Sequence, residues 1–306
     1  MSLRHLSIAS TATTILLVTV GGLVRATGSG LGCGDDWPGC NGKLLPVLDA
    51  RPVVIEYSHR FLAMVVGILV VAMVIAAFRE RRHRPALVKL SGAALVMVVL
   101  QAFLGRVVVE EELEAVLVVA HLGTALLFLG LLVVITSVLY RADGMSPAQV
   151  DGVVSRSARF MAAAVLLLLL VGSYTSDYGY VAGWPLQQSR LIPDLGATGE
   201  AVHFAHRVLA GVVGVMIAMF AVRVVRRRQV VPLGAKLAQV AAGLYGLELI
   251  IGGANVWTTL HPLVVTAHLA TGTLIWASLV AVASVTSPAV AASEMETRAL
   301  TPAGAT

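Results

Sequence analysis

Long apolar runs alternate with short polar links along the whole chain. A helix needs about 20 predominantly apolar residues to cross the hydrocarbon core of a bilayer. Runs of roughly this length lie near Leu6–Val24, Tyr57–Phe78, Leu87–Val109, Val116–Tyr140, Ala158–Tyr174, Val202–Val222, Leu233–Ala254 and Val264–Thr286. The first is interpreted as a helix rather than a signal peptide, because no small-residue cleavage site follows it. The pattern therefore predicts an all-α membrane protein with eight transmembrane helices.

Composition agrees with a membrane protein. Of the 306 residues, 58% are hydrophobic and only 13% are charged, whereas soluble domains carry about 25% charge. The net charge of +5 comes from basic residues that stand in short clusters between apolar runs. These clusters indicate membrane topology, and nucleic acid is not expected as a partner.

Basic and acidic residues occupy opposite sets of links. The links after the second, fourth and sixth predicted helices carry RERRHR (79–84), Arg141 with Arg156 and Arg159, and RVVRRR (223–228). The other links contain EELE (111–114), Asp35, Asp36, Asp49, Asp177, Asp194 and Glu200. Because Lys and Arg favour the cytoplasmic side, both termini are predicted to be cytoplasmic in a cell-membrane protein. The long links, roughly 25–55 and 175–201, then face outward.

An internal repeat relates the two halves of the chain. The segment EYSHRFLAMVVG (56–67) aligns with HFAHRVLAGVVG (203–214), and 206 − 59 and 268 − 121 both equal 147. The same offset places Trp37-Pro38 on Trp184-Pro185. We therefore expect two tandem, parallel four-helix-bundle repeats, residues 1–150 and 151–306. Repeats with an even number of helices are not inverted, which argues against a transporter built on inverted repeats.

Four histidines stand at matched places in this repeat. His59, His121, His206 and His268 fall at the starts of the second and fourth helices of the two halves, below the predicted outer surface. Ionisable residues in transmembrane segments are usually functional. Two imidazoles that face each other across a four-helix bundle can ligate a haem iron from both sides. A single hydrogen bond between helices is the alternative, and a non-haem metal would need further ligands such as Glu56 or His203.

Each half also carries an arginine directly after its first histidine. Arg60 and Arg207 are candidates for binding haem propionates, because a guanidinium pairs with a carboxylate through two hydrogen bonds. The alternative is an interfacial arginine that extends to lipid headgroups.

Acidic residues distinguish the two halves. Glu56 lies three residues before His59 and so on the same helix face, whereas the equivalent position in the second half is His203. This difference predicts that one half reacts and the other only holds a cofactor. The alternative is an exposed acid at a helix start, where it favours the dipole. Glu248, whose counterpart is Gln101, fits either proton handling or a hydrogen bond between helices.

The first outward link contains both cysteines of the chain, Cys33 and Cys40, within GGLVRATGSGLGCGDDWPGCNGK (21–43). An oxidising compartment favours a disulfide, which closes a short loop and contributes about 2–3 kcal/mol to stability. A structural and a redox role are both open. The second link has Tyr180 and Gln187 at the equivalent positions and therefore lacks the pair.

These residues together resemble the haem A synthase family over nearly the whole chain. The resemblance rests on the TGSGLGC and WPGC segments, ExxHR at 56–60, HxxHR at 203–207, His121 and His268. It implies an oxidoreductase that converts the ring C8 methyl group of haem O to a formyl group, giving haem A. It further implies a cofactor haem b between His206 and His268, haem O iron addressed by His59 and His121, and Glu56 near the reacting centre.

The resemblance also suggests partners and leaves one alternative function. Haem O is the implied substrate, and haem O synthase and cytochrome oxidase assembly are candidate partners within the bilayer. This chain departs from the family pattern, as some members do, in lacking cysteines in its second outward link. A di-haem bis-histidine cytochrome that only transfers electrons is the alternative, although it has no need of the difference between Glu56 and His203.

Overall fold

The computed structural model describes residues 2–34, 36–80, 84–142, 149–176, 192, 196 and 198–291. Across these residues run the helices α1 (Leu3–Ala26), α2 (Arg51–Arg79), α3 (Pro85–Glu110), α4 (Ala115–Ala142), α5 (Gly152–Thr175), α6 (Thr198–Arg226), α7 (Pro232–Trp257) and α8 (Pro262–Val285). All eight are long and apolar enough to cross a membrane. The predicted fold class, an all-α membrane protein with eight transmembrane helices, is thus confirmed.

Several helices begin earlier than their apolar runs, because capping and proline fix a polar first turn. Helix α2 begins at Arg51 with a proline in its first turn, where the missing N–H of proline has no helical partner to lose. Helix α5 begins at Gly152, and the side chain of Asp151 accepts hydrogen bonds from the N–H groups of Val153 and Val154. The sequence placed these two starts about six residues later, at Tyr57 and Ala158.

The earlier starts change the expected place of the histidines. His59 and His206 are each the ninth residue of their helices, and His121 and His268 are each the seventh. The sequence placed them among the first six residues of shorter helices, so they lie further from the helix starts than predicted. The histidines of the two halves nevertheless occupy the same positions in their helices.

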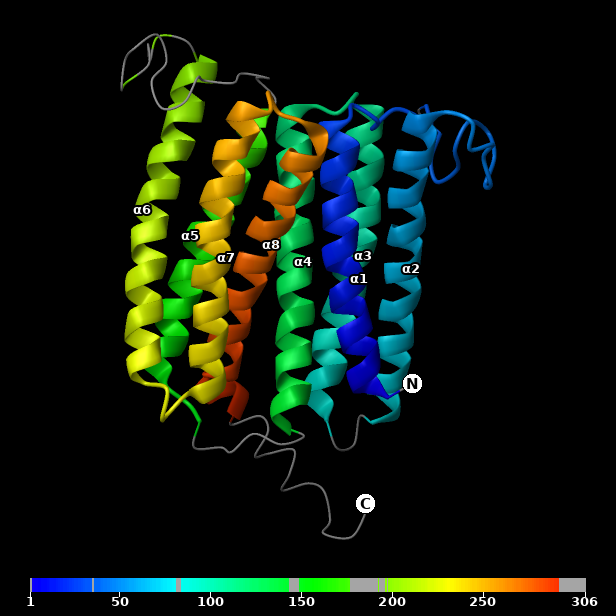
Figure 1. Cartoon of the computed structure of the whole chain (residues 1–306). Coiled ribbons are helices and arrows are strands. Elements are labelled where there is room, and N and C mark those ends of the chain that lie inside the picture. Colours follow the sequence, from blue (N-terminus) through cyan, green and yellow to red (C-terminus); the bar gives the residue numbers. More distant parts are fainter. Residues whose placement is uncertain are drawn as a thin grey trace.

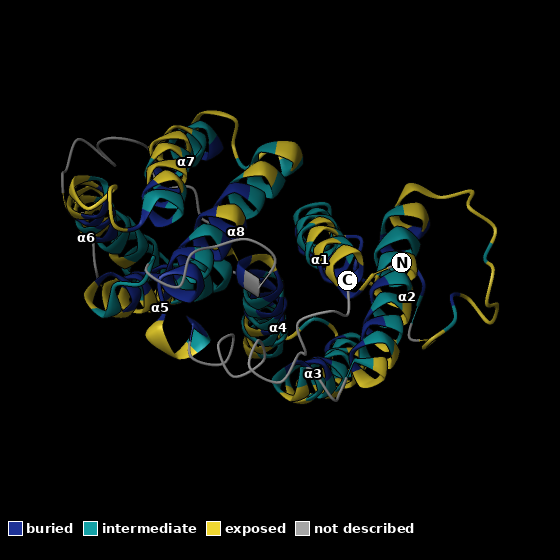
Figure 2. Cartoon of the chain, turned by 90° about the horizontal axis from the view of Figure 1, so that it is seen from below, coloured by how far each residue is buried: buried dark blue, intermediate teal, exposed yellow. Residues whose placement is uncertain are grey.

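The helices form two neighbouring groups of four (Figures 1 and 2). In one group α1 and α3 each contact α2 and α4, and in the other α5 and α7 each contact α6 and α8. The groups meet where α8 contacts α1 and α4, and where α4 contacts α5. The interface between the two groups therefore lies at the centre of the molecule, and α2, α3, α6 and α7 lie toward its ends.

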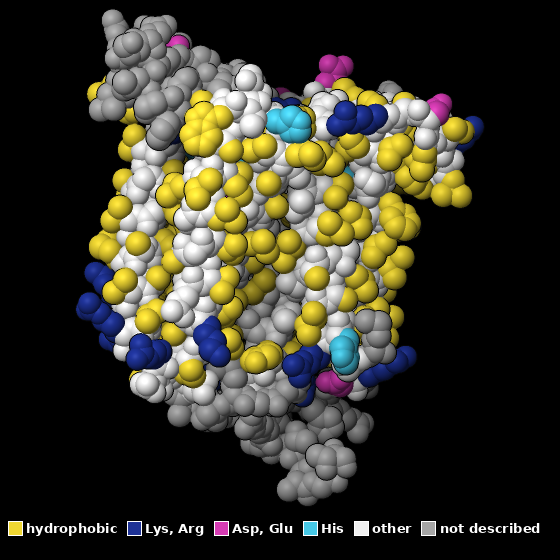
Figure 3. All heavy atoms as spheres, in the orientation of Figure 1, with side chains coloured by type: hydrophobic (Ala, Val, Ile, Leu, Met, Phe, Trp, Pro, Cys, Tyr) yellow, Lys and Arg dark blue, Asp and Glu magenta, His cyan; other side chains and the backbone are white. Residues whose placement is uncertain are grey.

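Apolar side chains cover the perimeter as well as the interior. Ile68 on α2 and Phe103 on α3 are 61% and 60% exposed, and hydrophobic side chains are spread over the middle of the face seen in Figure 3. Lipid tails are as apolar as these side chains, so their exposure is expected in a membrane-spanning region. Figure 2 shows the buried residues on the helix faces that point toward other helices.

A buried arginine joins the two groups of helices at the end where α8 terminates. Arg141, near the end of α4, is fully buried and donates hydrogen bonds to the carbonyl groups of Val285 and Gln149. The last carbonyl groups of a helix have no partners within it and carry a partial negative charge, which suits a guanidinium. The sequence had indicated only a topological role for Arg141.

An ion pair joins the start of α5 to the link between α6 and α7. Arg227 donates to Asp151 at 2.5 Å. Burial raises the pKa of the Asp151 carboxyl group, but hydrogen bonds from Val154, Arg227 and Val153 and the charge of Arg227 outweigh this effect. The pKa of Asp151 therefore lies below its ordinary value, and the carboxylate is charged at neutral pH.

Candidate functional site

The predicted site residues of both halves line one cavity of about 1870 Å³. This volume exceeds the roughly 300–1,000 Å³ of an ordinary small-molecule pocket. Its lining includes His59, His121, His206, His268, Glu56, Arg60, Arg207 and Glu248. The structure therefore brings together all the predicted ligands, the predicted catalytic acid and both predicted propionate-binding arginines.

The two histidines of the second half face each other across this cavity. The ring centroids of His206 on α6 and His268 on α8 are 6.5 Å apart, and the ring planes are inclined at 79°. Imidazole nitrogens bind a metal at about 2.0–2.1 Å, so an iron between two imidazoles separates their nitrogens by about 4 Å. Adding the ring radius on each side gives a separation close to the observed one.

The histidines of the first half have the same relationship to their helices. His59 on α2 and His121 on α4 line the cavity and lie within electrostatic range of each other. The Nδ1 atoms of His121 and His206 are buried and have no hydrogen-bond partner among the described residues. A buried polar atom without a partner is costly, and no hydrogen bond from Nδ1 to the described residues holds these two rings in place. Their second nitrogen, Nε2, is the atom that would bind a haem iron.

Glycines on neighbouring helices make room for each imidazole. A Cβ atom on Gly21 or Gly172 would lie 3.0 or 2.9 Å from the Cε1 atom of His59 or His206. On Gly105 and Gly252 it would lie 3.4 and 3.2 Å from the Cε1 atoms of His121 and His268. Because glycine has no Cβ, each ring packs directly against a neighbouring helix backbone. These four cradles fit rings that must stand in one orientation, as haem ligands do.

These four glycines were not predicted from the sequence, although two of them follow the internal repeat. Gly105 and Gly252 are separated by the same 147 residues as the histidines. Gly21 and Gly172 are separated by 151 residues, because Gly21 lies 38 residues before His59 whereas Gly172 lies 34 residues before His206. A search at one fixed offset therefore finds only the first pair.

A non-haem metal site is not favoured by the described part of the chain. No group of three or more His, Cys, Asp or Glu side chains in it is arranged to hold a metal ion. A haem supplies four nitrogen ligands of its own and needs only one or two axial side chains. Paired histidines in a large, mostly apolar cavity therefore fit a haem better than a free ion.

The two cysteines form the predicted disulfide. The sulfur atoms of Cys33 and Cys40 are 2.00 Å apart and both residues are fully buried. The N–H of Cys40 donates to the carbonyl of Lys43, and the N–H of Asn41 donates to that of Cys33. Gly32 allows the loop to approach α2, because a Cβ there would lie 2.5 Å from the carbonyl carbon of Pro52.

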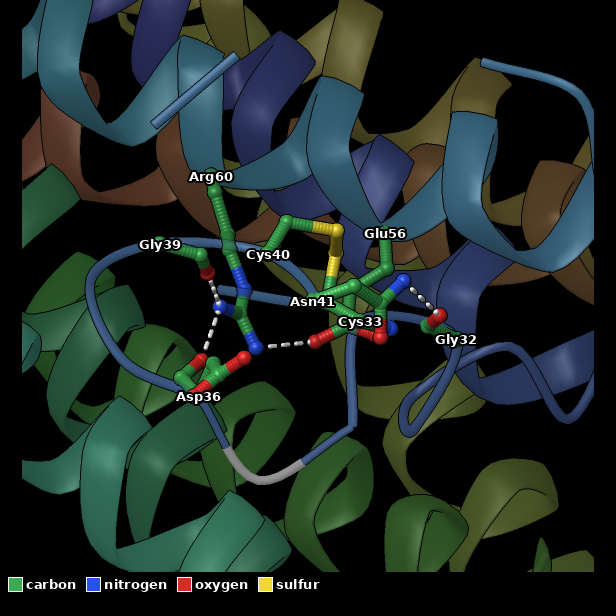
Figure 4. A network of polar contacts seen from close by, with 8 residues as sticks. All are labelled: Gly32, Cys33, Asp36, Gly39, Cys40, Asn41, Glu56 and Arg60. Carbon is green, nitrogen blue, oxygen red and sulfur yellow. Dashed lines mark hydrogen bonds and ion pairs between the residues drawn. A yellow bond between two sulfur atoms is a disulfide. The ribbon is translucent and has the colours of Figure 1, made fainter. Parts of the chain in front are cut away.

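Glu56 connects this disulfide loop to α2 (Figure 4). Its Oε2 atom accepts a hydrogen bond of 2.8 Å from the N–H of Cys33, and its Oε1 atom lies 2.5 Å from the guanidinium of Arg60. Only 3% of Glu56 is exposed. The alternative reading of Glu56 as an exposed acid at a helix start is therefore wrong.

Arg60 completes the same network. Its guanidinium also donates to the backbone carbonyl groups of Asp36 and Gly39 in the loop (Figure 4). The sequence had indicated a partner outside the protein, either a propionate or a lipid headgroup. In the structure Arg60 fastens the loop over the cavity, so that a propionate at this place would join an existing network.

The network leads to a prediction about the disulfide. Cys33→Ala is expected to lower the free energy of unfolding by about 2–3 kcal/mol, because the open loop gains conformational entropy when the chain unfolds. The measurement is thermal or denaturant unfolding of the purified protein. Alkylation without reductant should label neither cysteine of the wild type.

Cys40→Ala and the double variant are the matched controls. All three variants lose the same bond, so the double variant should be no less stable than either single one. Additive losses would mean that the cysteines stabilise the fold separately. Free thiols in freshly isolated protein would contradict both a structural and a redox role for an oxidised pair.

The described residues form a multi-pass membrane protein whose site fits a haem. Two histidine pairs line one cavity, and a disulfide loop is held beside it. The sequence model of the family COX15-CtaA, described as cytochrome oxidase assembly protein, matches residues 4–280. The chain belongs to this family.

Curated relatives resemble the chain over most of its length. A Heme A synthase of an Exiguobacterium species is 28% identical over 271 residues, which cover 83% of this chain and 85% of the relative. One from Geobacillus kaustophilus is 28% identical over 277 residues, covering 87% and 86%. A third, from Symbiobacterium thermophilum, is 30% identical over 227 residues, covering 71% and 73%.

Proposed function

We propose that this protein is a haem A synthase, a membrane oxidoreductase that converts the ring C8 methyl group of haem O to a formyl group. One observation carries the proposal: a chain of this family presents two matched histidine pairs to one cavity. Two pairs provide places for two haems, one to be changed and one to be kept. Relatives that match most of the chain bear the name of this activity.

The two halves have different tasks in this proposal. Residues 1–150 form the substrate half, where His59 and His121 address the iron of haem O. Residues 151–306 form the cofactor half, where His206 and His268 hold a haem b. Support comes from the contacts of α1–α4 and of α5–α8 among themselves, and from the difference between Glu56 and His203. Among the described residues of the second half, no disulfide stands beside the cavity.

The side chains around the substrate have separate roles. When bound, the haem of the second half supplies one-electron redox chemistry. The carboxylate of Glu56, held by the Cys33 N–H and Arg60, stabilises positive charge that develops at the oxidised carbon or accepts a released proton at Oε1. Arg60 and Arg207 hold propionates at the two places, and the apolar lining excludes water from both.

The haem sites lie nearer the outer face in the proposed orientation. Basic side chains gather at the end of the molecule where α1 begins and α8 ends (Figure 3), and Lys and Arg favour the cytoplasmic side. The four histidines lie in the first nine residues of helices that begin at the opposite end. Haem O then reaches the site from the bilayer, and haem O synthase and cytochrome oxidase assembly are partners on either side of the reaction.

The test is a comparison of haem extracts from cells that make haem O, with and without this protein. Haem A is expected only with the protein, and haem O should fall correspondingly. A di-haem cytochrome would leave haem O unchanged while the purified protein still shows a bis-histidine haem spectrum. Unchanged haem O together with folded, haem-loaded protein would therefore contradict the synthase activity and favour the cytochrome.

A further inference from the structure

Glu248 is a buried acid that the proposed mechanism does not use. It lies on α7 and faces the same cavity as the histidines. Its Oε1 atom is 3.2 Å from Nδ1 of His268 on α8, and the two side chains are 13% and 31% exposed. The atoms are within hydrogen-bond distance, although the ring is not aligned for a hydrogen bond in this structure. The Oε2 atom of Glu248 is buried and has no hydrogen-bond partner in the described part of the chain.

The neighbouring helix leaves space for this carboxylate. Gly272 follows His268 by one turn and lies on the same face of α8. A Cβ atom at Gly272 would be 3.1 Å from Oε1 of Glu248 and 2.7 Å from Cδ2 of Leu169. Glycine at this position therefore permits the carboxylate to lie beside the histidine.

The first half differs at both of these positions. The counterpart of Glu248 is Gln101, and the counterpart of Gly272 is Ala125. The side-chain amide of Gln101 donates to Oγ1 of Thr124 at 2.5 Å, and Nδ1 of His121 has no hydrogen-bond partner among the described residues. A carboxylate thus stands beside a histidine in one half, and a neutral amide turned to a hydroxyl group takes its place in the other.

We infer that Glu248 is a positioning residue for the haem of the second half: its carboxylate accepts a hydrogen bond from Nδ1–H of His268, so that Nε2 faces the iron. The inference rests on the proposed cofactor role of His206 and His268. A carboxylate behind a ligating histidine fixes the ring and its tautomer and makes the nitrogen a stronger donor. The stronger donor and the added negative charge both favour the oxidised iron.

This asymmetry suits the different fates of the two haems. A cofactor haem must stay bound through many reactions, whereas a substrate haem must leave after one. An anionic partner on His268 strengthens retention in the second half. The neutral Gln101 at the matching position of the first half provides no such anionic partner for His121, which suits release of the product.

The experiment compares purified wild type with Glu248→Ala, Glu248→Gln and the matched variant of the first half, Gln101→Ala. Two quantities are measured: the rate at which haem b transfers to excess apomyoglobin, and the reduction potential of the bound haem followed by its absorption spectrum. Neither quantity requires haem O or turnover. Both therefore report on the cofactor site independently of synthase activity.

Glu248→Ala is expected to speed haem b transfer by about 10–100-fold, the usual effect of removing a partner of a metal ligand. At a fixed applied potential its ratio of reduced to oxidised haem should rise about tenfold, which is 59 mV for one electron. Glu248→Gln should restore slow transfer, because its amide oxygen still accepts Nδ1–H, but should keep the raised potential. Gln101→Ala should match the wild type in both measurements.

Three outcomes would overturn the inference, and they differ in what else they affect. A wild-type potential in Glu248→Gln, or equal effects of Glu248→Ala and Gln101→Ala, would contradict the role of Glu248 alone. A haem b that survives both His206→Ala and His268→Ala would contradict the proposed cofactor site and this inference with it. Glu248→Gln keeps the size and polarity of the side chain, so the potential can be tested even if the alanine variant does not fold.

Discussion

Glu56→Ala is expected to insert in the membrane, keep the haem b of its second half and lose about 100-fold or more of its haem A formation. A positioned acid or base contributes about 10²–10⁴-fold to catalysis, and Glu56 is the acid that lines the cavity one turn before His59. His59 and His121 are intact in this variant, so haem O should still bind. Extracts should then contain haem O or a partly oxidised hydroxymethyl form in place of haem A.

The structure shows why the alanine variant alone is not a sufficient test. Glu56 accepts the N–H of Cys33 and pairs with Arg60, so its removal also loosens the disulfide loop. Glu56→Gln separates the two effects, because an amide oxygen still accepts the N–H of Cys33 but carries no charge. Loss of product in Glu56→Gln with an intact disulfide would assign the effect to charge or proton transfer. Normal product would assign it to the hydrogen bond.

Glu110→Gln is a matched control for this experiment. Glu110 pairs with Arg106 four residues earlier at the same end of the molecule, but the two side chains are 44% and 51% exposed. A surface ion pair contributes little to stability, so this variant should form haem A at the wild-type rate. A normal yield of haem A from Glu56→Ala would contradict a catalytic role for Glu56. Its remaining role would be to hold the disulfide loop against α2.

The second large effect is expected at the cofactor histidines. His206→Ala or His268→Ala should remove most of the haem b absorbance of the purified protein, because each removes one of two axial ligands and leaves a cavity beside a glycine. His59→Ala should leave much of that absorbance, since its ring faces the place proposed for haem O. The measurement is the haem b spectrum per protein after purification.

His261→Ala is the control for these variants. His261 caps the start of α8 seven residues before His268, and its Nδ1 accepts the N–H of Leu263. Its replacement should leave the haem b content unchanged. If His59→Ala strips haem b while His206→Ala and His268→Ala keep it, the assignment of the two halves must be reversed.

Local patterns predicted the elements, and failed where the helix ends are polar. The apolar runs located all eight helices, because a bilayer requires every spanning segment to be long and apolar. They misplaced the starts of α2 and α5, since the turns at Arg51 and Gly152 are set by a proline and an aspartate cap rather than by hydrophobicity. The disulfide was predicted from two cysteines in one outward link and is confirmed.

The candidate site was predictable as a set of residues but not as an arrangement. The repeat identified His59, His121, His206 and His268, and the structure places them all on one cavity. Glu56 was singled out by its difference from His203, yet neither its contact with Cys33, in a loop 23 residues earlier, nor its ion pair with Arg60 on the same helix was expected. Roles for these residues stay predictions until the variants are measured.

The sequence by itself determined the number of helices, the family and the histidines, because each depends on residue type and spacing along the chain. Only the tertiary structure decided which side chains meet: Glu248 with His268, Glu56 with the disulfide loop, and a glycine with each imidazole. The physical reason lies in the membrane. Lipid-facing and core-facing positions are equally apolar, so hydrophobicity does not reveal which face of a helix contacts its neighbours, and packing has to settle it.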